Sequence, residues 1–511
     1  MERLGLAVRK RKVRVRVLLA ALVVALLIGG AVPFVAGPGR SYLSYLVLAE
    51  RQDAAGARGA ADRAREAGGR VVQEYPQIGV VLAYATGGFA QRLRGAPGIA
   101  AVGATRTTPV PGPPGALDGE GGFGPAVRGD AVRAADATDG GESADSDEAL
   151  TPDPGESVDW NLAMIGAAGR TAGAGTRPAA LVRTPGAAKP NGEELRRVLV
   201  AVLDSGVDDT HPDLRLAVDP AASASCADGR PDARYGAWRP DRGVGESGHG
   251  THVAGIVGAA RDGRGVTGVA PGVRIAAVRL LGPLGQYYAE NIVCGMLWSA
   301  DHGARAVNDS YFADPWKYNC PQDPDQAALI LAVGRAVAYA QRQGAVVVAS
   351  AGNDGLDLGA VRHDRRSPND RLSGPGQDRY LGPDCVRLPG ELPGVLTVAA
   401  VDRNGLPSGY SNYGRGRISI AAPGGEPDGG AEGAIVSAWP GGRYAALAGT
   451  SMAAAHVSGA VAVAAAAHPD WRPERLAALL ADSAAGNCPY APGACAERQF
   501  FGAGVLALPA G

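Results

Sequence analysis

Residues 448–459 read AGTSMAAAHVSG, and this stretch is the last of four glycine-rich motifs that decide how the chain folds. The three earlier motifs are VAVLDSGVDDTHPDL at 200–214, GHGTHVAG at 248–255 and ASAGNDG at 349–355. They place an aspartate, a histidine, an asparagine and a serine in that order along the chain. One such motif alone is weak evidence of function. All of them in order, separated by apolar β-like runs, form a specific pattern.

The residue types in these motifs match the parts of a nucleophilic catalyst. A serine hydroxyl is a poor nucleophile until a neighbouring imidazole takes its proton. The imidazole needs a carboxylate that holds its tautomer, and the tetrahedral intermediate needs a hydrogen-bond donor for its oxyanion. The motifs supply Ser451 as the nucleophile and His249 as the general base. They also supply Asp204 to orient His249, and Asn353 as the oxyanion donor.

The order aspartate, histidine, serine is that of the subtilisin arrangement of such a triad. Over roughly residues 158–508, the chain resembles the subtilases, the subtilisin-like serine peptidases. The resemblance implies a serine endopeptidase that acts on a protein or peptide substrate and needs no cofactor for catalysis. A subtilase-fold binding protein that has lost activity is the alternative from another class. The candidate residues are intact at all four positions, which argues against it.

The region 196–508 alternates apolar, β-like runs with helix-like stretches. The predicted strands are RRVLVAVLD (196–204), VRIAAVRLL (273–281), ARAVNDS (304–310), GAVVVASAG (344–352), GVLTVAAV (394–401) and GRISIAA (416–422). Stretches such as 289–302 and 325–343 supply crossover helices. Strands this apolar are buried on both faces, so we expect a doubly wound parallel α/β sheet. Its active site should lie beyond the C-terminal ends of the strands.

Each candidate residue also has an ordinary structural interpretation. Asp204 suits a strand-end cap, Asn353 a turn and Ser451 a helix N-cap. For Ser451 the two interpretations coincide, because a helix N-terminus also presents N–H groups to an oxyanion. Of the two histidines in HGTHVAG, the resemblance gives the base role to His249. His252, one turn later, is expected to be a packed, hydrogen-bonded residue.

The strand expected to line the substrate cleft departs from the family pattern. Subtilases usually carry an Asn-x-Ser-x-Gly string there, whereas this chain reads NDSYF at 308–312. The resemblance implies that substrate pairs with this strand as an added β-strand, and that Ser310, Tyr311 and Gly352 bind it. The string ADPWKYNC at 313–320 resembles subtilases associated with lantibiotic leader-peptide processing. A membrane-anchored processing protease of narrow specificity is therefore the alternative within the enzyme class.

The loop between His249 and Pro271 has the length found in subtilases that bind a structural calcium ion there. Calcium takes hard oxygen ligands. The resemblance assigns side-chain ligands to Asp213 in HPDL and Asp262 in ARDGRG, with backbone carbonyls as the remaining ligands. Solvated loop acids are the alternative, and the two interpretations carry equal weight.

The first 36 residues predict an export segment. The run VLLAALVVALLIGGAVPFVA at 17–36 carries no charge, and basic residues precede it. They are Arg9, Lys10, Arg11, Lys12, Arg14 and Arg16. This is the pattern of a signal peptide, and the run is also about long enough to span a bilayer. A cleaved signal is slightly favoured over an uncleaved membrane anchor. Both place the rest of the chain outside the cell, either secreted or anchored.

Residues 41–109 predict a small ferredoxin-like α+β unit with the order β-α-β-β-α-β. It resembles the inhibitor-type propeptide of subtilases, which folds separately and inhibits its own enzyme with its C-terminal end. A generic α+β domain without that role is the alternative. Residues 110–157 are acidic and poor in large apolar side chains, as is typical of a linker. Residues 158–511 then form the predicted peptidase domain.

Cysteines and charge agree with an exported enzyme. Six cysteines in a chain with an export segment predict three disulfides, although the pairing cannot be deduced from sequence alone. The short loop CPYAPGAC favours Cys488 with Cys495, and Cys320 with Cys385 is a weaker expectation. A free thiol pair is the alternative. Lys and Arg number 50 against 51 Asp and Glu, which gives no indication of a nucleic-acid partner.

Overall fold

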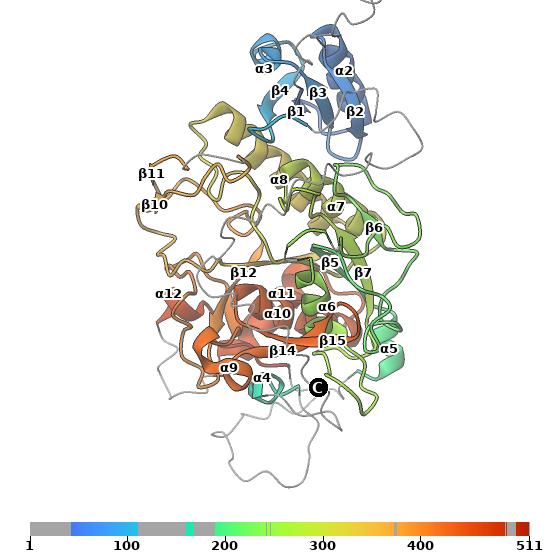
Figure 1. Ribbon diagram of the computed structural model, residues 1–511, viewed down its shortest axis with the longest axis vertical. Helices are drawn as coiled ribbons and strands as arrows, with labels where there is room; N and C mark the ends of the chain where they lie inside the picture. Colours follow the sequence, from blue (N-terminus) through green and yellow to red (C-terminus); the bar gives the residue numbers. More distant parts are fainter. Residues whose placement is uncertain are drawn as a thin grey trace, which may run out of the picture.

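The computed structural model describes residues 42–110, 160–167, 190–241, 243–245, 247–371, 376–485, 487 and 497–509. The predicted export segment, most of the predicted linker and the expected Cys488–Cys495 pair lie outside the described residues. Within the described residues, a small unit of residues 42–110 lies against one end of a large α/β domain (Figure 1).

A seven-stranded parallel sheet forms the centre of the large domain. Its strand order is β13 (Ile420–Pro423), β12 (Leu396–Val401), β9 (Val346–Ser350), β8 (Ala306–Asp309), β5 (Leu199–Asp204), β7 (Arg274–Arg279) and β6 (Ala224–Ser225). Every neighbouring pair in this sheet is parallel. Each predicted strand contains or overlaps one of the observed strands, so the predicted doubly wound α/β fold is confirmed.

Helices cover both faces of this sheet (Figure 1). One face packs against α6 (His249–Gly258), α10 (Thr450–Ala467) and α11 (Pro473–Ala485). The other packs against α7 (Ala289–Asp301) and α8 (Pro324–Arg342). Alternate residues of β5 divide between the two cores: Val200 and Val202 face the first, and Ala201 and Leu203 the second. A strand buried on both faces must be apolar throughout, which explains the continuous apolar runs.

The N-terminal unit has the predicted element order. Its elements are β1 (Leu43–Ala49), α2 (Ala54–Glu66), β2 (Arg70–Tyr75), β3 (Val80–Ala85), α3 (Phe89–Leu93) and β4 (Ile99–Ala104). The strands pair antiparallel in the order β2-β3-β1-β4. Helix α2 packs on one face of this sheet. On the other face, Leu46 and Leu82 share a core with α7 and α8. At Gly103 a Cβ would lie 2.5 Å from the Asp325 carbonyl oxygen, so β4 meets α8 with no room for a side chain.

Shorter elements complete the domain. They are α4 (Trp160–Met164), α5 (Gly192–Arg196), β10 (Arg362–Asp364), β11 (Arg379–Leu381), η2 (Pro427–Gly429), α9 (Gly430–Gly433), β14 (Ile435–Trp439), β15 (Arg443–Leu447) and α12 (Arg498–Phe501). The Trp160 indole N–H donates to the Ala434 carbonyl at 3.3 Å, and Ile165 is buried in the core shared with α10. The segment WNLAMIGA at 160–167 therefore packs onto the large domain.

Two disulfides link segments distant in sequence. Cys320 pairs with Cys385, as predicted, and Cys226 pairs with Cys294. The described part of the chain contains no free cysteine. Cys226 lies in the loop after β6 and Cys294 within α7, so the second disulfide ties the edge of the sheet to a covering helix.

Among the described helices, α10 alone is long and apolar enough to cross a membrane by length and composition. Of its apolar window, 89% is buried inside the domain. Contact with the central strands accounts for its apolar sequence, because a core helix that faces other elements on all sides carries no polar face.

Candidate active site

Two strands and two helices bring the four motifs together at one edge of the central sheet. Asp204 is the last residue of β5, and His249 is the first residue of α6. Asn353 follows the end of β9, and Ser451 lies in the first turn of α10. In a parallel sheet, this C-terminal edge is where polar side chains from several strands converge.

Asp204 and His249 form a buried pair. The Nδ1 atom of His249 lies 2.8 Å and 2.9 Å from the two carboxylate oxygens of Asp204. A carboxylate only accepts hydrogen bonds, so this contact places the ring proton on Nδ1 and leaves Nε2 as a proton acceptor. The backbone N–H of Ser205 also donates to Asp204 at 2.6 Å. An imidazole held in this way can act as a general base.

Ser451 lies next to Ser310, which follows β8. Its Oγ donates to the Ser310 carbonyl at 3.4 Å, and the Ser310 Oγ donates to the Ser451 carbonyl at 3.1 Å. Ser310 was predicted to bind substrate, and these two bonds bring its segment beside the nucleophile. Ser451 also lies at a helix N-terminus, where free N–H groups and the helix dipole favour a negative charge.

Thr450 orients the side-chain amide of Asn353. Both the backbone N–H and the hydroxyl of Thr450 donate to Asn353 Oδ1, at 2.9 Å and 2.7 Å. The Thr450 hydroxyl in turn accepts the Gly352 N–H at 3.1 Å. Because Oδ1 is fixed toward Thr450, the Nδ2 donor group points away from it and can serve an oxyanion. Thr450 had no predicted role, although it stands inside the GTS motif.

The other histidines near the site are structural. His252 is buried and its Nε2 lies 3.1 Å from the carbonyls of Ile435 and Ala445, as expected for a packed residue. Burial lowers the pKa of His252 to about 3. Burial likewise lowers the pKa of His456 in α10 to about 4, and its ring contacts Asn161 at 2.8 Å. Both rings are therefore neutral at physiological pH.

A buried acidic residue lies behind the Asp204–His249 pair, and sequence reasoning gave it no role. Asp309 ends β8 and is fully buried. Burial raises the pKa of Asp309 to about 7, with a further upward contribution from Asp204. The Tyr311 hydroxyl donates to the Asp309 carboxyl group. The Tyr311 ring stacks on Tyr287 at 4.9 Å between centroids, and the Tyr287 hydroxyl reaches Asp204 at 3.5 Å.

The two other predicted substrate-binding residues have different surroundings. Tyr311 is only 5% exposed and its hydroxyl is committed to Asp309, so the hydroxyl does not face substrate. Gly352 has a φ of +102°, which favours glycine. A Cβ there would lie 2.5 Å from Asn412 Nδ2 and 3.1 Å from Arg387 Cζ. Both the backbone conformation and the close contacts therefore require glycine beside Asn353.

Among the described residues, the two predicted calcium ligands, Asp213 and Asp262, are not joined by a third acidic residue in a possible metal site. Asp213 is buried, and its Oδ2 accepts the Val266 N–H and the Tyr444 hydroxyl, each at 3.0 Å. Asp262 lies 3.9 Å from the Arg264 guanidinium. The described residues contain no group of three or more His, Cys, Asp or Glu that could hold a metal ion. A calcium ion would have to compete with Tyr444 for Asp213, so calcium binding stays a prediction from sequence.

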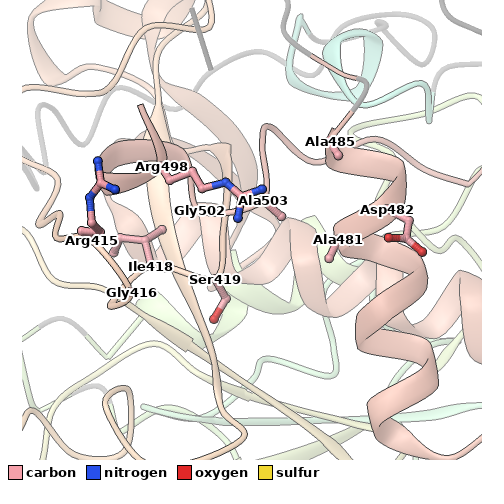
Figure 2. Close-up of a pocket in the computed structure, with 10 residues that line it drawn as sticks. All are labelled: Arg415, Gly416, Ile418, Ser419, Ala481, Asp482, Ala485, Arg498, Gly502 and Ala503. Atoms are coloured by element: carbon pink, nitrogen blue, oxygen red, sulfur yellow. The ribbon is translucent and has the colours of Figure 1, made fainter. Parts of the chain in front are cut away.

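A cavity of the described residues lies elsewhere. It has a volume of about 620 Å³ and lies between α11 and the segment before β13 (Figure 2). Its lining includes Arg415, Asp482 and Arg498, and none of the predicted site residues. The candidate site is instead defined by its hydrogen bonds at the sheet edge.

The site combines a buried carboxylate–imidazole pair, a serine at a helix N-terminus and an oriented asparagine amide on a parallel α/β sheet. This combination defines the class of subtilisin-like serine peptidases. The profile described as "Subtilase family" matches residues 196–504. That match covers more than half of the chain, so the chain belongs to the subtilase family.

Comparison with individual proteins agrees with this family. The chain is 34% identical to fervidolysin of Fervidobacterium pennivorans over 310 residues, which are 56% of this chain and 37% of that protein. It is 32% identical to subtilisin Savinase of Lederbergia lenta over 274 residues, or 54% of this chain and 78% of that protein. The chain thus spans little more than a third of the length of fervidolysin.

Among solved structures, the fold is similar to that of the epidermin leader peptide processing serine protease EpiP from Staphylococcus aureus. The TM-score is 0.64 at 20% sequence identity, and the likeness covers 92% of this chain and 98% of that chain. The crystal structure of fervidolysin has a TM-score of 0.55 at 23% identity and covers 93% of this chain and 61% of that chain. At these identities the likeness concerns the fold alone.

Proposed function

We propose that the chain is an exported serine endopeptidase that hydrolyses peptide bonds through Asp204, His249 and Ser451, with Asn353 as the oxyanion donor. The contact of His249 Nδ1 with both Asp204 oxygens carries this proposal, because it prepares the imidazole to accept a proton on Nε2. Membership of the subtilase family supports it. The basic and apolar segment at 1–36 and the two disulfides support export.

The reaction follows from these groups. Ser451 Oγ attacks the scissile carbonyl carbon while its proton passes to His249 Nε2, and the Asp204 carboxylate stabilises the imidazolium. The carbonyl oxygen becomes an oxyanion that accepts hydrogen bonds from Asn353 Nδ2 and from the N–H groups at the start of α10. As the C–N bond breaks, His249 returns the proton to the leaving amine. Water then attacks the acyl-enzyme by the same proton transfers and releases Ser451.

The N-terminal unit acts as an intramolecular inhibitor that the enzyme removes from itself. Its sheet packs on α7 and α8, and its tail binds the large domain. Thr107 donates its backbone N–H to Asp370 at 2.7 Å, and Thr108 does so at 3.3 Å. The first cut should fall close to Arg106, Thr107 and Thr108, after which the linker is open to trimming toward Trp160.

A narrower substrate is a second candidate within the same chemistry. The fold likeness to a protease that processes the epidermin leader peptide, together with the string at 313–320, supports processing of a peptide leader. A panel of intact candidate precursor peptides, compared with unfolded casein, separates this role from general proteolysis. A leader-processing enzyme should cut its precursor at one bond and leave casein largely intact.

Maturation in a host lacking other exported proteases tests the proposal. The wild-type chain should yield two fragments, an enzyme and an N-terminal unit of roughly seventy residues plus any retained anchor. Ser451→Ala should accumulate only the uncut precursor, and secretion and fold should be unchanged. Cleavage near Thr108 in Ser451→Ala would mean that another protease performs this step.

A further inference from the structure

Arg387 is a buried cation that the proposed mechanism does not use. Its side chain belongs to the segment between β11 and β12, and the residue is only 4% exposed. Within the part of the chain that the structure describes, its Nε and Nη1 atoms have no hydrogen-bond partner. Burial removes the hydration of a guanidinium, and an unpaired buried cation is therefore costly to keep. A bound anionic ligand would stabilise such a group.

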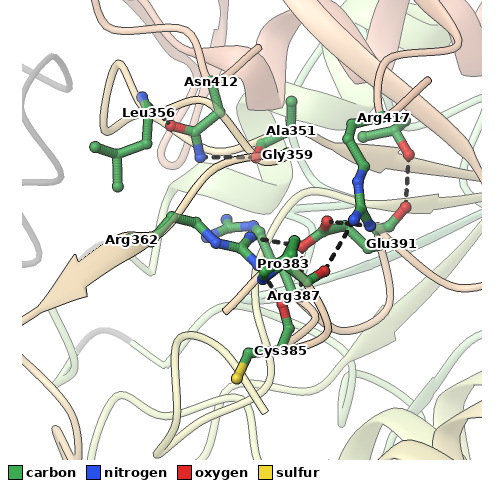
Figure 3. A network of polar contacts seen from close by, with 12 residues as sticks. Ala351, Leu356, Gly359, Arg362, Pro383, Cys385, Arg387, Glu391, Asn412 and Arg417 are labelled. Carbon is green, nitrogen blue, oxygen red and sulfur yellow. Dashed lines mark hydrogen bonds and ion pairs between the residues drawn. The ribbon is translucent and has the colours of Figure 1, made fainter. Parts of the chain in front are cut away.

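The carboxylate that accepts the Arg387 backbone N–H, that of Glu391, is already engaged by other cations. Glu391 accepts hydrogen bonds from Arg362 at 3.1 Å and Arg417 at 3.3 Å, as Figure 3 shows. It also accepts the backbone N–H of Arg387 at 2.8 Å. Of Arg387, only the backbone N–H takes part in this network, and none of the three bonds involves its guanidinium.

Two further acidic side chains near this guanidinium are also engaged. Asp354 forms an ion pair with Lys317. Asp314 accepts hydrogen bonds from the Asn369 amide and the Tyr287 N–H. These three carboxylates therefore have partners other than the Arg387 guanidinium.

The guanidinium lies between the two segments that flank the nucleophile. Its Nη1 is 3.2 Å from the position that a Cβ would take at Gly352, the residue before Asn353. Its Cζ lies 4.9 Å from the ring centroid of Phe312, which is partly exposed. Phe312 follows Ser310, whose carbonyl contacts Ser451.

The reaction geometry places a substrate side chain in the same position. The reacting carbonyl must have its carbon at Ser451 Oγ and its oxygen at Asn353 Nδ2. The residue that supplies this carbonyl has its side chain only two bonds from the reacting carbon. That side chain must lie against the segments at 310–312 and 352–353, where the unpartnered donors of Arg387 are.

We propose that Arg387 determines specificity by binding a substrate carboxylate, so that the enzyme prefers glutamate or aspartate before the bond that it cleaves in other molecules. The cut near Thr108 is intramolecular, and the tail already bound to the large domain does not need this contact. The inference rests on the proposed function and adds its substrate class. A guanidinium presents paired N–H donors that match a carboxylate, and bonds of this kind are stronger than those between neutral groups. Glutamine has nearly the same shape as glutamate but no charge. A peptide with glutamine before the scissile bond is therefore the matched control for the glutamate peptide.

The test measures kcat/KM of the enzyme obtained from the full chain on quenched peptides that differ only at the residue before the scissile bond. Glutamate, aspartate, glutamine, leucine and arginine occupy that position in turn. Glutamate should exceed glutamine by about 10²-fold, and the glutamate-to-aspartate ratio shows which chain length fits. Arg387→Met should bring the glutamate-to-glutamine ratio close to one through loss on the glutamate peptide. Arg417→Met removes a cation of the same network that is paired with Glu391, and should leave the ratio unchanged.

Equal cleavage of the glutamate and glutamine peptides by the wild type overturns the proposal, as does an unchanged ratio in Arg387→Met. If Arg387→Met does not fold, Arg387→Lys keeps the charge at a different reach. The preference for glutamate should then persist at a smaller ratio, and its disappearance or an unchanged ratio would count against Arg387. Treatment with a fluorophosphonate that labels Ser451 distinguishes failure of the Arg387 proposal from failure of the proposed function. Labelling without an acidic preference refutes only the role of Arg387, whereas absent labelling refutes the proposed function.

Discussion

Arg106, in the tail of the N-terminal unit, forms an ion pair with Glu290 of α7, and both side chains are buried. The Arg106 Nη2 lies 2.5 Å from Glu290 Oε1, and its Cζ lies 3.9 Å from the centroid of the Tyr288 ring. The Ser44 hydroxyl donates to the same Glu290 oxygen at 3.0 Å. One carboxylate of the large domain thus holds two separate segments of the N-terminal unit.

Replacing Glu290 by glutamine should weaken the hold on the N-terminal unit. Removing the charge leaves buried Arg106 without its ion-pair partner, which costs several kcal/mol at buried charge pairs. We expect the released unit, added back to mature enzyme, to inhibit Glu290→Gln with a Ki that is about 10²-fold higher than for the wild type. The matched control is Asp325→Asn, which removes the charge from the exposed Arg94–Asp325 pair between the same two units. A similar effect in both variants would contradict a special role for Glu290.

The orientation of Asn353 by Thr450 predicts two graded losses of turnover. Asn353→Leu removes the oxyanion donor and should lower kcat by ~10²–10³-fold with little change in KM. Thr450→Val removes one of the two bonds that fix the amide, so a smaller loss of kcat is expected. Steady-state kinetics on one peptide substrate measures both. An Asn353→Leu enzyme with wild-type kcat would remove Asn353 from the mechanism.

Asp309 predicts a pH dependence of stability. Burial raises its pKa to about 7, whereas the unfolded chain releases this proton near pH 4. Between these values the folded state binds more protons than the unfolded state, so the free energy of unfolding falls as pH rises. Asp309→Asn has no carboxyl group at this position, so its free energy of unfolding does not carry this pH dependence. Its stability relative to the parent should therefore increase from about pH 4 to pH 7 and stay level above that.

Chemical denaturation of Ser451→Ala with and without Asp309→Asn measures this difference without self-digestion. Asp470→Asn, at an exposed position, is the control and should follow the parent at every pH. A constant gap between Asp309→Asn and its parent from pH 4 to pH 8 would show that Asp309 does not titrate in this window.

Calcium binding at Asp213 and Asp262 predicts that a chelator lowers the Tm of the wild-type enzyme. Binding to the folded state alone stabilises by mass action, so the shift should depend on calcium concentration. Asp262→Ala should lose the response. If the chelator leaves the Tm of the wild type unchanged, Asp213 binds only its protein partners, Val266 and Tyr444.

The local parts of the fold and site followed from sequence. Most predicted strands centre on an apolar run, and burial on both faces of a parallel sheet demands such runs. The motif residues were predicted because chemistry restricts their types and turns restrict their neighbours. Cys320 with Cys385 was expected for its loop-like setting, whereas Cys226 with Cys294 has no such signal, because Cys294 lies within helix α7.

The features that sequence did not reveal depend on contacts between distant segments. Asp309 is one acidic residue within NDSYF, and only the folded sheet shows that it is buried beside Asp204. Arg387 has no motif around it, and its significance depends on Glu391 being engaged by Arg362 and Arg417. Tyr311 was assigned to substrate from its place in the strand, yet its hydroxyl turns inward to Asp309. Side-chain direction at such positions is decided by packing rather than by local pattern.

The central claim is that Ser451 attacks the substrate carbonyl after His249, oriented by Asp204, removes its proton. Mass spectrometry of the enzyme after treatment with a fluorophosphonate tests it most directly. The account predicts one adduct, located on Ser451, that forms far more slowly in His249→Ala and not at all in Ser451→Ala. An adduct on another residue, or peptide hydrolysis by Ser451→Ala at close to the wild-type rate, would contradict it.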